Sequence, residues 1–263
     1  MIFTSASEPD FGGKMPHLLC APGDIAPVVL LPGDPGRVEM FPKLCDDFRI
    51  LSRNREYTVG SGTYRGMPVT VCSTGIGGPS TEIAVLELIA LGAKALIRIG
   101  GTGAIKEEIA CSDIILNTAA MRMGGASQFY AEPEYPAVAS FETVECLKQA
   151  CEEEHLRCHM GICASVGSFY RGQGRTPPGQ RETDERNVLE KYRRLNILNL
   201  EMEAETIFTL ASLYGVYSGS ICTVHCNRMT DQWLLDNEDS QRQMCKAALS
   251  GALLLYKKYL QEK

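Results

Sequence analysis

Short runs of Val, Ile and Leu alternate along the chain with longer segments in which apolar residues recur at helical spacing. This alternation is typical of strands in a mainly parallel sheet whose two faces are covered by helices. It predicts an α/β fold, a single domain with a central mixed, largely parallel sheet flanked by helices. The runs that we expect to form strands are residues 27–31, 69–73, 95–99, 113–116, 159–166, 197–200 and 219–224.

Three segments between and after these runs have the periodicity of helices. Residues 81–91 carry apolar side chains on one face and stop at Gly92, which readily adopts the left-handed conformation that ends a helix. Residues 206–213 are expected to form a second helix. Residues 240–260 repeat apolar positions on one face and have basic residues near their end, as expected of a structural helix that covers the sheet.

Two other segments are rich in Gly, Pro and polar residues, which is typical of loops. They are residues 124–136 and 171–182, and the second follows an expected strand closely. We therefore expect both loops to contribute to a functional site.

Composition narrows the class of partner. The chain has 263 residues, of which 44% are hydrophobic and 22% charged, enough for one domain that spans residues 1–263. Residues 1–20 are a candidate arm that reaches a neighbouring subunit. The formal net charge of -6 removes the broad attraction that nonspecific nucleic-acid binding needs, so we expect a small-molecule partner and no nucleic acid.

The sequence also predicts a compartment. No apolar run approaches the roughly 20 residues that span a bilayer, and Glu8 and Asp10 stand where a signal peptide would be basic and then apolar. The chain has 11 cysteines without a C-x-x-C pair, which favours reduced packing residues over disulfides or zinc ligands. We expect a cytoplasmic protein that has no membrane partner.

Three of the expected strands end in glycine-rich turns, at residues 32–37, 75–80 and 100–103. Such turns expose backbone N–H groups where the next helix begins, and an anion can bind there. None of them has the strict G-x-G-x-x-G spacing of dinucleotide sites or the Gly-Lys-Ser/Thr ending of a P-loop. Arg37 and Arg98 flank two of the turns with guanidinium groups suited to phosphate oxygens, whereas any one turn taken alone also fits a purely structural function.

At these residues the chain resembles the uridine phosphorylases, which belong to the nucleoside phosphorylase family. Residues 72–81 (CSTGIGGPST) are similar to the equivalent segment of that family, and further similar motifs follow in the same order over nearly the whole chain. These motifs are residues 29–38, 54–56, 98–105, 169–175 and 199–203. The resemblance implies that phosphate attacks the anomeric carbon of a ribonucleoside, through a transition state with a cationic ribose and an anionic base. It implies inorganic phosphate as co-substrate and no cofactor.

The resemblance also implies which residues bind phosphate. Arg37, Arg98 and the backbone around Gly33 would do so, and Arg55 would join them across a subunit contact, although a surface salt bridge is the alternative for Arg55. The family commonly has threonine directly after Arg-Ile-Gly, whereas this chain has Gly101 and then Thr102. Thr102 or a neighbouring backbone N–H is then expected to make that contact.

For the ribose, the resemblance selects among the residues of a Glu-Met-Glu triplet. Glu201 and Glu203 would share one side of an extended strand, so spacing alone does not choose between them. In the family the second glutamate holds a ribose hydroxyl and the methionine packs against the sugar, which assigns Glu203 and Met202 to the ribose and implies a break in the strand. The same resemblance places His17 at the 5′-hydroxyl of a neighbouring subunit's ribose, with an ordinary surface histidine as the alternative.

Base recognition is expected from Gln173 and Arg175. A glutamine amide can pair with a carbonyl and the N3–H of uracil together, and an arginine can stabilise charge on a carbonyl. Phe169 would stack on or beside the base. Purine-cleaving relatives place an aspartate acid near the end of the late strand, where this chain has the neutral Asn227. Uridine phosphorolysis in pyrimidine salvage is therefore the leading hypothesis, with catalysis by Arg98, Gln173, Arg175 and Glu203.

Two alternative functions stay open at this point, a purine nucleoside phosphorylase and a nucleoside-binding protein whose catalysis is impaired because of Gly101. Glu56, Ile76 and Ser80 match positions that hold a monovalent cation between subunits in some relatives. Because Arg55 and His17 are expected to act in a neighbouring subunit, the predicted assembly is a homodimer, or a hexamer built from dimers.

Overall fold

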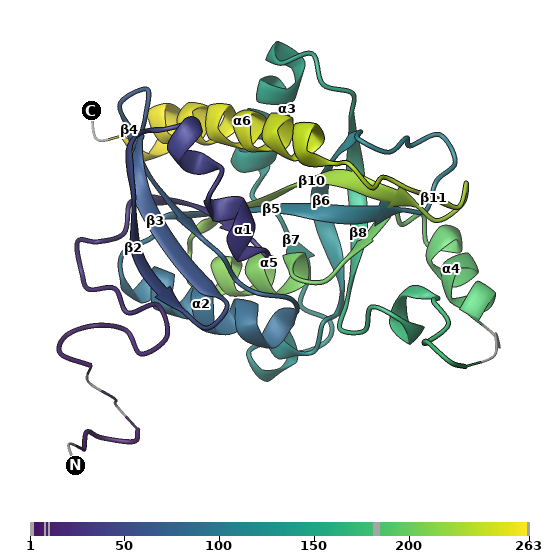
Figure 1. Cartoon of the computed structure of the whole chain (residues 1–263). Coiled ribbons are helices and arrows are strands. Elements are labelled where there is room, and N and C mark those ends of the chain that lie inside the picture. Colours follow the sequence, from purple (N-terminus) through teal and green to yellow (C-terminus); the bar gives the residue numbers. More distant parts are fainter. Residues whose placement is uncertain (1–2, 8, 10, 181–184, 262–263) are drawn as a thin grey trace.

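The computed structural model describes residues 3–7, 9, 11–180 and 185–261, and it places eleven strands in one continuous sheet (Figure 1). In chain order they are β1 (Val28–Pro32), β2 (Asp46–Asn54), β3 (Tyr57–Tyr64), β4 (Met67–Cys72), β5 (Ala95–Ala104), β6 (Ile114–Met123), β7 (Ala137–Val138), β8 (Cys158–Val166), β9 (Asn199–Glu201), β10 (Tyr217–Asn227) and β11 (Gln232–Trp233). Residues 1–2, 8 and 10 of the expected arm and residues 181–182 of the expected loop lie outside the described residues.

The sheet closes on itself through β5. This strand pairs in parallel with β10 along its whole length and in antiparallel with β9 at its end. Since β10 also pairs with β6, β6 with β8 and β8 with β9, these five strands form a ring. On the edge opposite β10, β9 pairs with the end of β5 and β1 pairs in parallel with the preceding residues of β5; β1 continues through β4 to the antiparallel strands β3 and β2. The sheet is therefore mixed, with parallel pairs at its centre.

Helices cover both faces of the open part of the sheet (Figure 1). The helices are α1 (Pro35–Val38), α2 (Gly78–Ala90), α3 (Phe141–Glu153), α4 (Glu185–Arg194), α5 (Ala204–Leu213) and α6 (Glu238–Leu255). On one face α3 and α6 pack together over a core that includes Leu30, Ile97 and Met244. On the other, α2 and α5 pack over a core that includes Leu31 and Leu88.

The predicted α/β class and every predicted strand position are confirmed, but β5 and β6 run five and seven residues past their expected ends, so residues 100–103 lie within β5 and do not form the expected turn. The helix expected at residues 81–91 begins earlier, at Gly78, because Pro79 suits a first helical turn. The C-terminal helix ends as an α-helix at Leu255 and continues as a π-helical turn over Tyr256–Leu260. The sequence did not indicate β2 and β3, which form a hairpin at the sheet edge. Among the described residues, no helix is long and apolar enough to cross a membrane.

The N-terminal segment before β1 has its own attachment to the fold. Leu18 and Cys20 are fully or almost fully buried, and the backbone N–H of Leu18 donates to the carboxylate of Glu87 in α2 at 2.8 Å. The described residues between Phe3 and Lys14 are exposed. The last part of the expected arm therefore packs against this subunit.

We expect Leu88→Ala to destabilise the protein, because Leu88 is fully buried between α2 and the sheet. Truncation of a buried leucine typically lowers the free energy of unfolding by about 2–5 kcal/mol. Urea denaturation followed by circular dichroism measures the effect. Leu235→Ala is the matched control, since that side chain is 92% exposed, and equal losses for the two variants would contradict the packing described here.

Candidate active site

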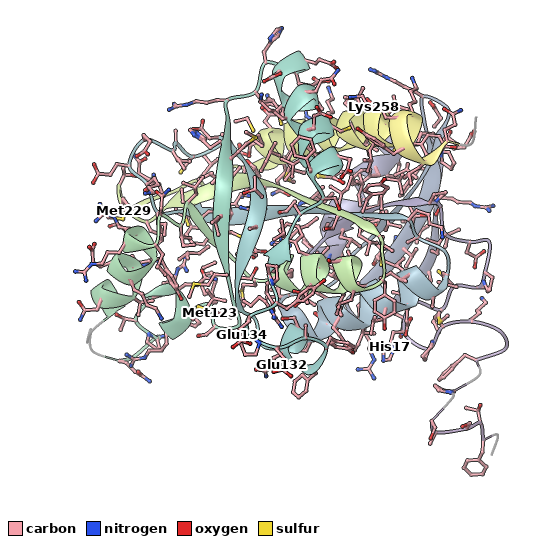
Figure 2. All side chains as sticks on the ribbon, turned by 180° about the vertical axis from the view of Figure 1, so that it is seen from behind. His17, Met123, Glu132, Glu134, Met229 and Lys258 are labelled. Atoms are coloured by element: carbon pink, nitrogen blue, oxygen red, sulfur yellow. The ribbon has the colours of Figure 1, made fainter. Side chains whose placement is uncertain are left out.

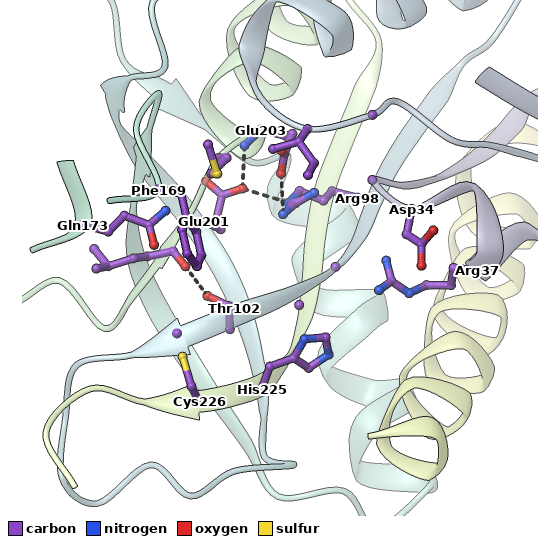
Figure 3. A pocket seen from close by; sticks show the side chains of 18 of the residues that line it. Asp34, Arg37, Arg98, Thr102, Phe169, Gln173, Glu201, Glu203, His225 and Cys226 are labelled. Carbon is purple, nitrogen blue, oxygen red and sulfur yellow. Dashed lines mark hydrogen bonds and ion pairs between the residues drawn. The ribbon is translucent and has the colours of Figure 1, made fainter. Parts of the chain in front are cut away.

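A pocket of about 710 Å³ opens where β1, β4, β5, β9 and β10 end (Figure 3). The carboxyl ends of parallel strands meet at one sheet edge, which is where ligands of α/β proteins bind. Both glycine-rich turns and the glycine-rich end of β5 reach the pocket. Its lining consists of Gly33, Asp34, Pro35, Arg37, Glu56, Gly75, Ile76, Ser80, Arg98, Gly100, Gly101, Thr102, Gly103, Phe169, Gln173, Arg175, Leu200, Glu201, Met202, Glu203, His225, Cys226 and Trp233.

A buried arginine lies between two buried carboxylates at the centre of the pocket (Figure 3). Arg98 Nη2 is 2.6 Å from Glu203 Oε2, and Arg98 Nε is 2.8 Å from Glu201 Oε2 without a well-aligned N–H bond. The guanidinium lies over Gly100, where a Cβ would come within 2.8 Å of Nη2. The absence of a side chain at Gly100 is therefore what makes room for Arg98.

Glu201 organises the backbone around this ion pair. Its Oε2 accepts the N–H groups of Glu203 and Ala204 at 2.8 and 2.9 Å, so it caps the start of α5. Its Oε1 accepts a hydrogen bond from the Ser165 hydroxyl on β8. The expected break in the strand is present, since β9 ends at Glu201 and α5 begins at Ala204. Sequence reasoning left Glu201 unassigned because its partners come from other strands.

Glu203 is held by a turn from another part of the chain. The N–H of Gly77, in the turn between β4 and α2, donates to Glu203 Oε1 at 2.6 Å. Gly77 has φ of 91°, a conformation that other residues rarely adopt. Burial raises the pKa of Glu203, although Arg98 opposes that shift. Burial alone would lower the pKa of Arg98, but Glu203 and Glu201 outweigh it and raise that pKa. Mutual pairing thus keeps the charges in place.

Arg37 reaches the pocket from the other side, out of the first glycine-rich turn. Its Nε donates to Gln241 Oε1 at 2.9 Å and its Nη1 to the carbonyl of Ile99 at 3.3 Å. The carboxylate of Asp34 accepts the N–H of Gly36, which fixes the turn that carries Arg37. Burial lowers the pKa of Arg37. Gln241 lies on α6, which the sequence suggested was purely structural, and no local pattern pointed to its contact with Arg37.

The loop after β8 forms the third wall. Arg175 Nη1 donates to Gln173 Oε1 at 2.7 Å, and the Arg175 guanidinium lies 4.1 Å from the centre of the Phe169 ring. Arg228 donates to the carbonyls of Gln173 and Gly174 at 2.7 and 2.9 Å and so fixes this loop against β10. The three residues expected at the base therefore form one cluster.

Comparison with known proteins decides the family. Residues 27–255 match the model of the phosphorylase superfamily. The chain belongs to this superfamily. It is 46% identical to the uridine phosphorylase of Thermococcus kodakarensis over 88% of this chain and 84% of that protein. It is 39% identical to the uridine phosphorylase of Haemophilus influenzae over 86% and 89%. It is also 36% identical to the guanosine phosphorylase of Halorubrum lacusprofundi over 91% and 95%.

Within this phosphorylase chain, two of the expected site residues lie away from the pocket lining. His17 lies beside α2, where its Nδ1 is 2.7 Å from Glu87 Oε1 (Figure 2). Arg55 is exposed in the turn between β2 and β3, next to Glu56 at the pocket rim. Both were predicted to act in a neighbouring subunit, and their outward positions leave that prediction in place.

Position 101 is the point at which the chain departs from the family pattern, and the structure shows what surrounds it. The hydroxyl of Thr102 donates to the carbonyl of Leu200 at 2.7 Å and accepts from Asn199 Nδ2 at 2.8 Å. Its single proton is thus used within the protein, so the Thr102 hydroxyl has no proton left to donate to phosphate. The side chain nearest to Gly101 is His225, which sequence reasoning did not select.

The residues predicted to hold a cation lie together at the pocket rim. The Ser80 hydroxyl donates to the carbonyl of Ile76 at 3.4 Å, and both Ser80 and Glu56 lie against Gly75. A carboxylate, a carbonyl and a hydroxyl are suitable oxygen ligands for such an ion. In the described part of the chain, no group of three or more His, Cys, Asp or Glu residues could hold a metal ion.

The other predicted site loop, residues 124–136, does not line the pocket. Arg122 holds it from the end of β6, by donating to the carbonyls of Ala131 and Tyr135 at 2.8 and 2.9 Å. The loop includes the short 3-10 helix Ala126–Phe129 and packs near α2 and α5. The expectation that this loop contributes to the pocket was therefore wrong for the single subunit, because Arg122 holds the loop's carbonyls away from the pocket.

We expect Arg98→Met to destabilise the phosphorylase strongly, since it leaves two buried carboxylates without their cation. Breaking a buried ion pair on one side typically costs about 3–5 kcal/mol. Without Arg98 the pKa of Glu203 rises further above its unfolded value, so the folded variant binds protons that the unfolded chain does not. The stability of the variant should therefore recover as the pH falls through that raised pKa.

Urea denaturation between pH 7 and pH 5, without ligands, measures this effect. Arg194→Met is the control, because Arg194 is 78% exposed in its pair with Glu190 and such pairs contribute at most about 1 kcal/mol. If the loss of stability does not depend on pH, the unpaired carboxylates are not its cause.

Proposed function

We propose that this protein is a uridine phosphorylase, which converts uridine and phosphate to uracil and ribose 1-phosphate. The proposal rests mainly on one observation, which is that side chains suited to three different parts of the substrates line the same pocket. They are the free side of the Arg37 guanidinium, the Glu203 carboxylate held by Arg98, and the paired side chains of Gln173 and Arg175. The family and the 46% identity to a uridine phosphorylase support it.

Phosphate would bind between Arg37, Arg98 and the backbone around Gly33. This backbone lies against the second glycine-rich turn, since the N–H of Thr74 donates to the carbonyl of Pro32 at 2.9 Å. The acceptors that hold Arg37 are neutral oxygens, so its positive charge remains available to an anion. Preorganised charges of this kind in a dry pocket lower a barrier by several kcal/mol.

Ribose would lie between this phosphate and the base, against Met202 and Glu203. In the reaction a phosphate oxygen forms a bond to C1′ while the bond from C1′ to the base nitrogen breaks, and the electron pair of that bond leaves with the base. The ribose becomes cationic on the way. Glu203 would bind a ribose hydroxyl and, with Glu201, would add negative charge near that cation.

Uracil would lie against Phe169, with Gln173 and Arg175 at its polar edge. The Gln173 oxygen has two lone pairs, of which Arg175 uses one, so the second can accept the N3–H while the amide nitrogen donates to a uracil carbonyl. Burial and, after it, the charge of Arg228 lower the pKa of Arg175. A positive charge here stabilises the anionic leaving base.

A guanosine phosphorylase among the relatives makes purine cleavage the second candidate. The proposal favours the pyrimidine because of Asn227. Its Nδ2 donates to the carbonyls of Lys106 and Ile109 at 2.9 and 2.6 Å, and its Oδ1 accepts the N–H of Met229 and Thr230. Asn227 is thus fully used in a turn outside the pocket lining and has no acidic proton for a purine.

We further propose a homodimer as the minimal active unit, with His17 and Arg55 acting in the neighbouring site, and a hexamer built from three dimers as the larger assembly. Glu56, Ile76 and Ser80 would then hold a monovalent cation at the contact. The 11 cysteines are free thiols, which suits the proposed cytoplasmic location.

The test follows uracil release from uridine with and without phosphate, and compares guanosine and inosine at equal concentration. We expect phosphate-dependent release, faster for uridine than for either purine. Gln173→Ala should lower kcat/KM for uridine about 10- to 100-fold, since hydrogen bonds to charged or developing-charge groups contribute about 1.5–3 kcal/mol. Gln149→Ala is the control, because this glutamine bonds Glu153 on the exposed face of α3. Release without phosphate, or faster purine cleavage, would contradict the proposal.

A further inference from the structure

His225 enters the pocket through an irregularity in β10. Along the pairing with β5, Val224 lies opposite Thr102 and Cys226 lies opposite Gly103, so His225 is an extra residue between two regular partners. Such a bulge re-aims a side chain, and bulges are common beside active sites. The ring of His225 therefore lines the pocket, where Figure 3 shows it turned to the side of Arg37.

The ring occupies the space in which a side chain at position 101 would lie. A Cβ on Gly101 would come within 2.4 Å of both Cε1 and Nδ1 of His225. This is far inside the closest approach of nonbonded atoms, so the ring would have to move. Gly101 and His225 consequently form a matched pair, and a threonine at position 101 would exclude the histidine from its present position.

The imidazole is a neutral polar group with unused hydrogen-bonding capacity. Burial and then the charge of Arg37 lower its pKa to about 4, so it is uncharged at neutral pH. One ring nitrogen then carries a proton and can donate. Its Nε2 is buried without a hydrogen-bond partner among the described residues. Because Nε2 is buried, a ligand in the pocket would bond the other ring nitrogen, Nδ1, which faces the space beside Gly101.

We propose that His225 is a substrate-contacting residue that donates a ring N–H to phosphate and thereby takes the place of the missing side chain at position 101. The inference rests on the proposed function, because phosphate is the co-substrate it invokes. Thr102 is the other candidate near this position, but its hydroxyl proton already bonds the carbonyl of Leu200. Arg37, on the same side of the pocket, supplies the charge that brings the anion within reach of the ring.

The experiment compares four variants by their KM for phosphate and for uridine, and by the thermal stabilisation that inorganic phosphate alone provides. His225→Phe keeps a planar ring without the N–H, and His225→Ala removes the ring. Both should raise the KM for phosphate about 10- to 100-fold, as expected for one hydrogen bond to a charged group, and change the KM for uridine much less. Both should also reduce stabilisation by phosphate.

The other two variants test the pairing. Gly101→Thr should lose phosphate affinity because the threonine displaces the ring, whereas Gly101→Thr combined with His225→Ala should recover part of it, since the threonine hydroxyl then has room. His155→Asn is the control for loss of an exposed imidazole elsewhere. An unchanged phosphate KM in His225→Phe would overturn the proposal, and so would additive losses in the double variant.

The outcomes also separate this inference from the proposed function. A wild-type protein that cleaves no nucleoside refutes the proposed function, and phosphate stabilisation of wild type against His225→Phe then tests the contact directly. If the wild-type protein cleaves uridine and the His225→Phe variant has the same KM for phosphate, the inference is refuted and the proposed function is not. Circular dichroism of each variant establishes whether a loss reflects misfolding, and the conservative phenylalanine keeps the test available if Gly101→Thr does not fold.

Discussion

The ion pair of Arg98 with Glu201 and Glu203 is the interaction on which the rest of the site depends. Burying three charged groups is costly, and the cost is offset only when each charge is paired and its remaining hydrogen bonds are made. Groups from several elements bond the two carboxylates, namely the hydroxyl of Ser165 on β8, the N–H of Gly77 before α2 and the first N–H groups of α5. The ion pair therefore joins strands and helix starts that are far apart in sequence.

The sheet topology explains why these groups meet. β5 pairs with β10 on one edge, and on the other edge with β1 and then, at its end, with β9, so it belongs both to the open sheet and to the ring of strands. Arg98 and the glycines after it lie on this shared strand. The bare Cα positions of Gly100 and Gly101 are each covered by a side chain, the Arg98 guanidinium over the first and the His225 ring over the second. Two neighbouring glycines thus admit two polar groups into a crowded centre.

The sequence predicted those parts of the molecule whose cause is local. The buried strand β1 is a continuous apolar run that a glycine-rich turn follows directly, whereas the glycines expected to end β5 proved to lie within that strand. The β2–β3 hairpin was not predicted, because β2 lies at the sheet edge. Most of its side chains are at least partly exposed there, so its sequence is not an apolar run. The contacts of Gln241 and Glu201 in the site were not predicted for another reason: their partners lie up to 204 positions away in the sequence. The bulge at His225 depends on how β10 pairs with β5, so the sequence of either strand alone does not indicate it.

Arg98 and Arg37 differ in the groups that hold them, since the acceptors are charged for one and neutral for the other. This difference fits the charges that develop during phosphorolysis. Carboxylates hold Arg98, so the group of Arg98, Glu201 and Glu203 has a net charge of about -1 when both acids are ionised. Neutral oxygens hold Arg37, which keeps its full positive charge. An anion entering the pocket is drawn to Arg37, while a cation forming on the ribose would face the negative group. Because opposite charges are fixed on the two sides before the substrates bind, little reorganisation is needed when charge separates in the transition state.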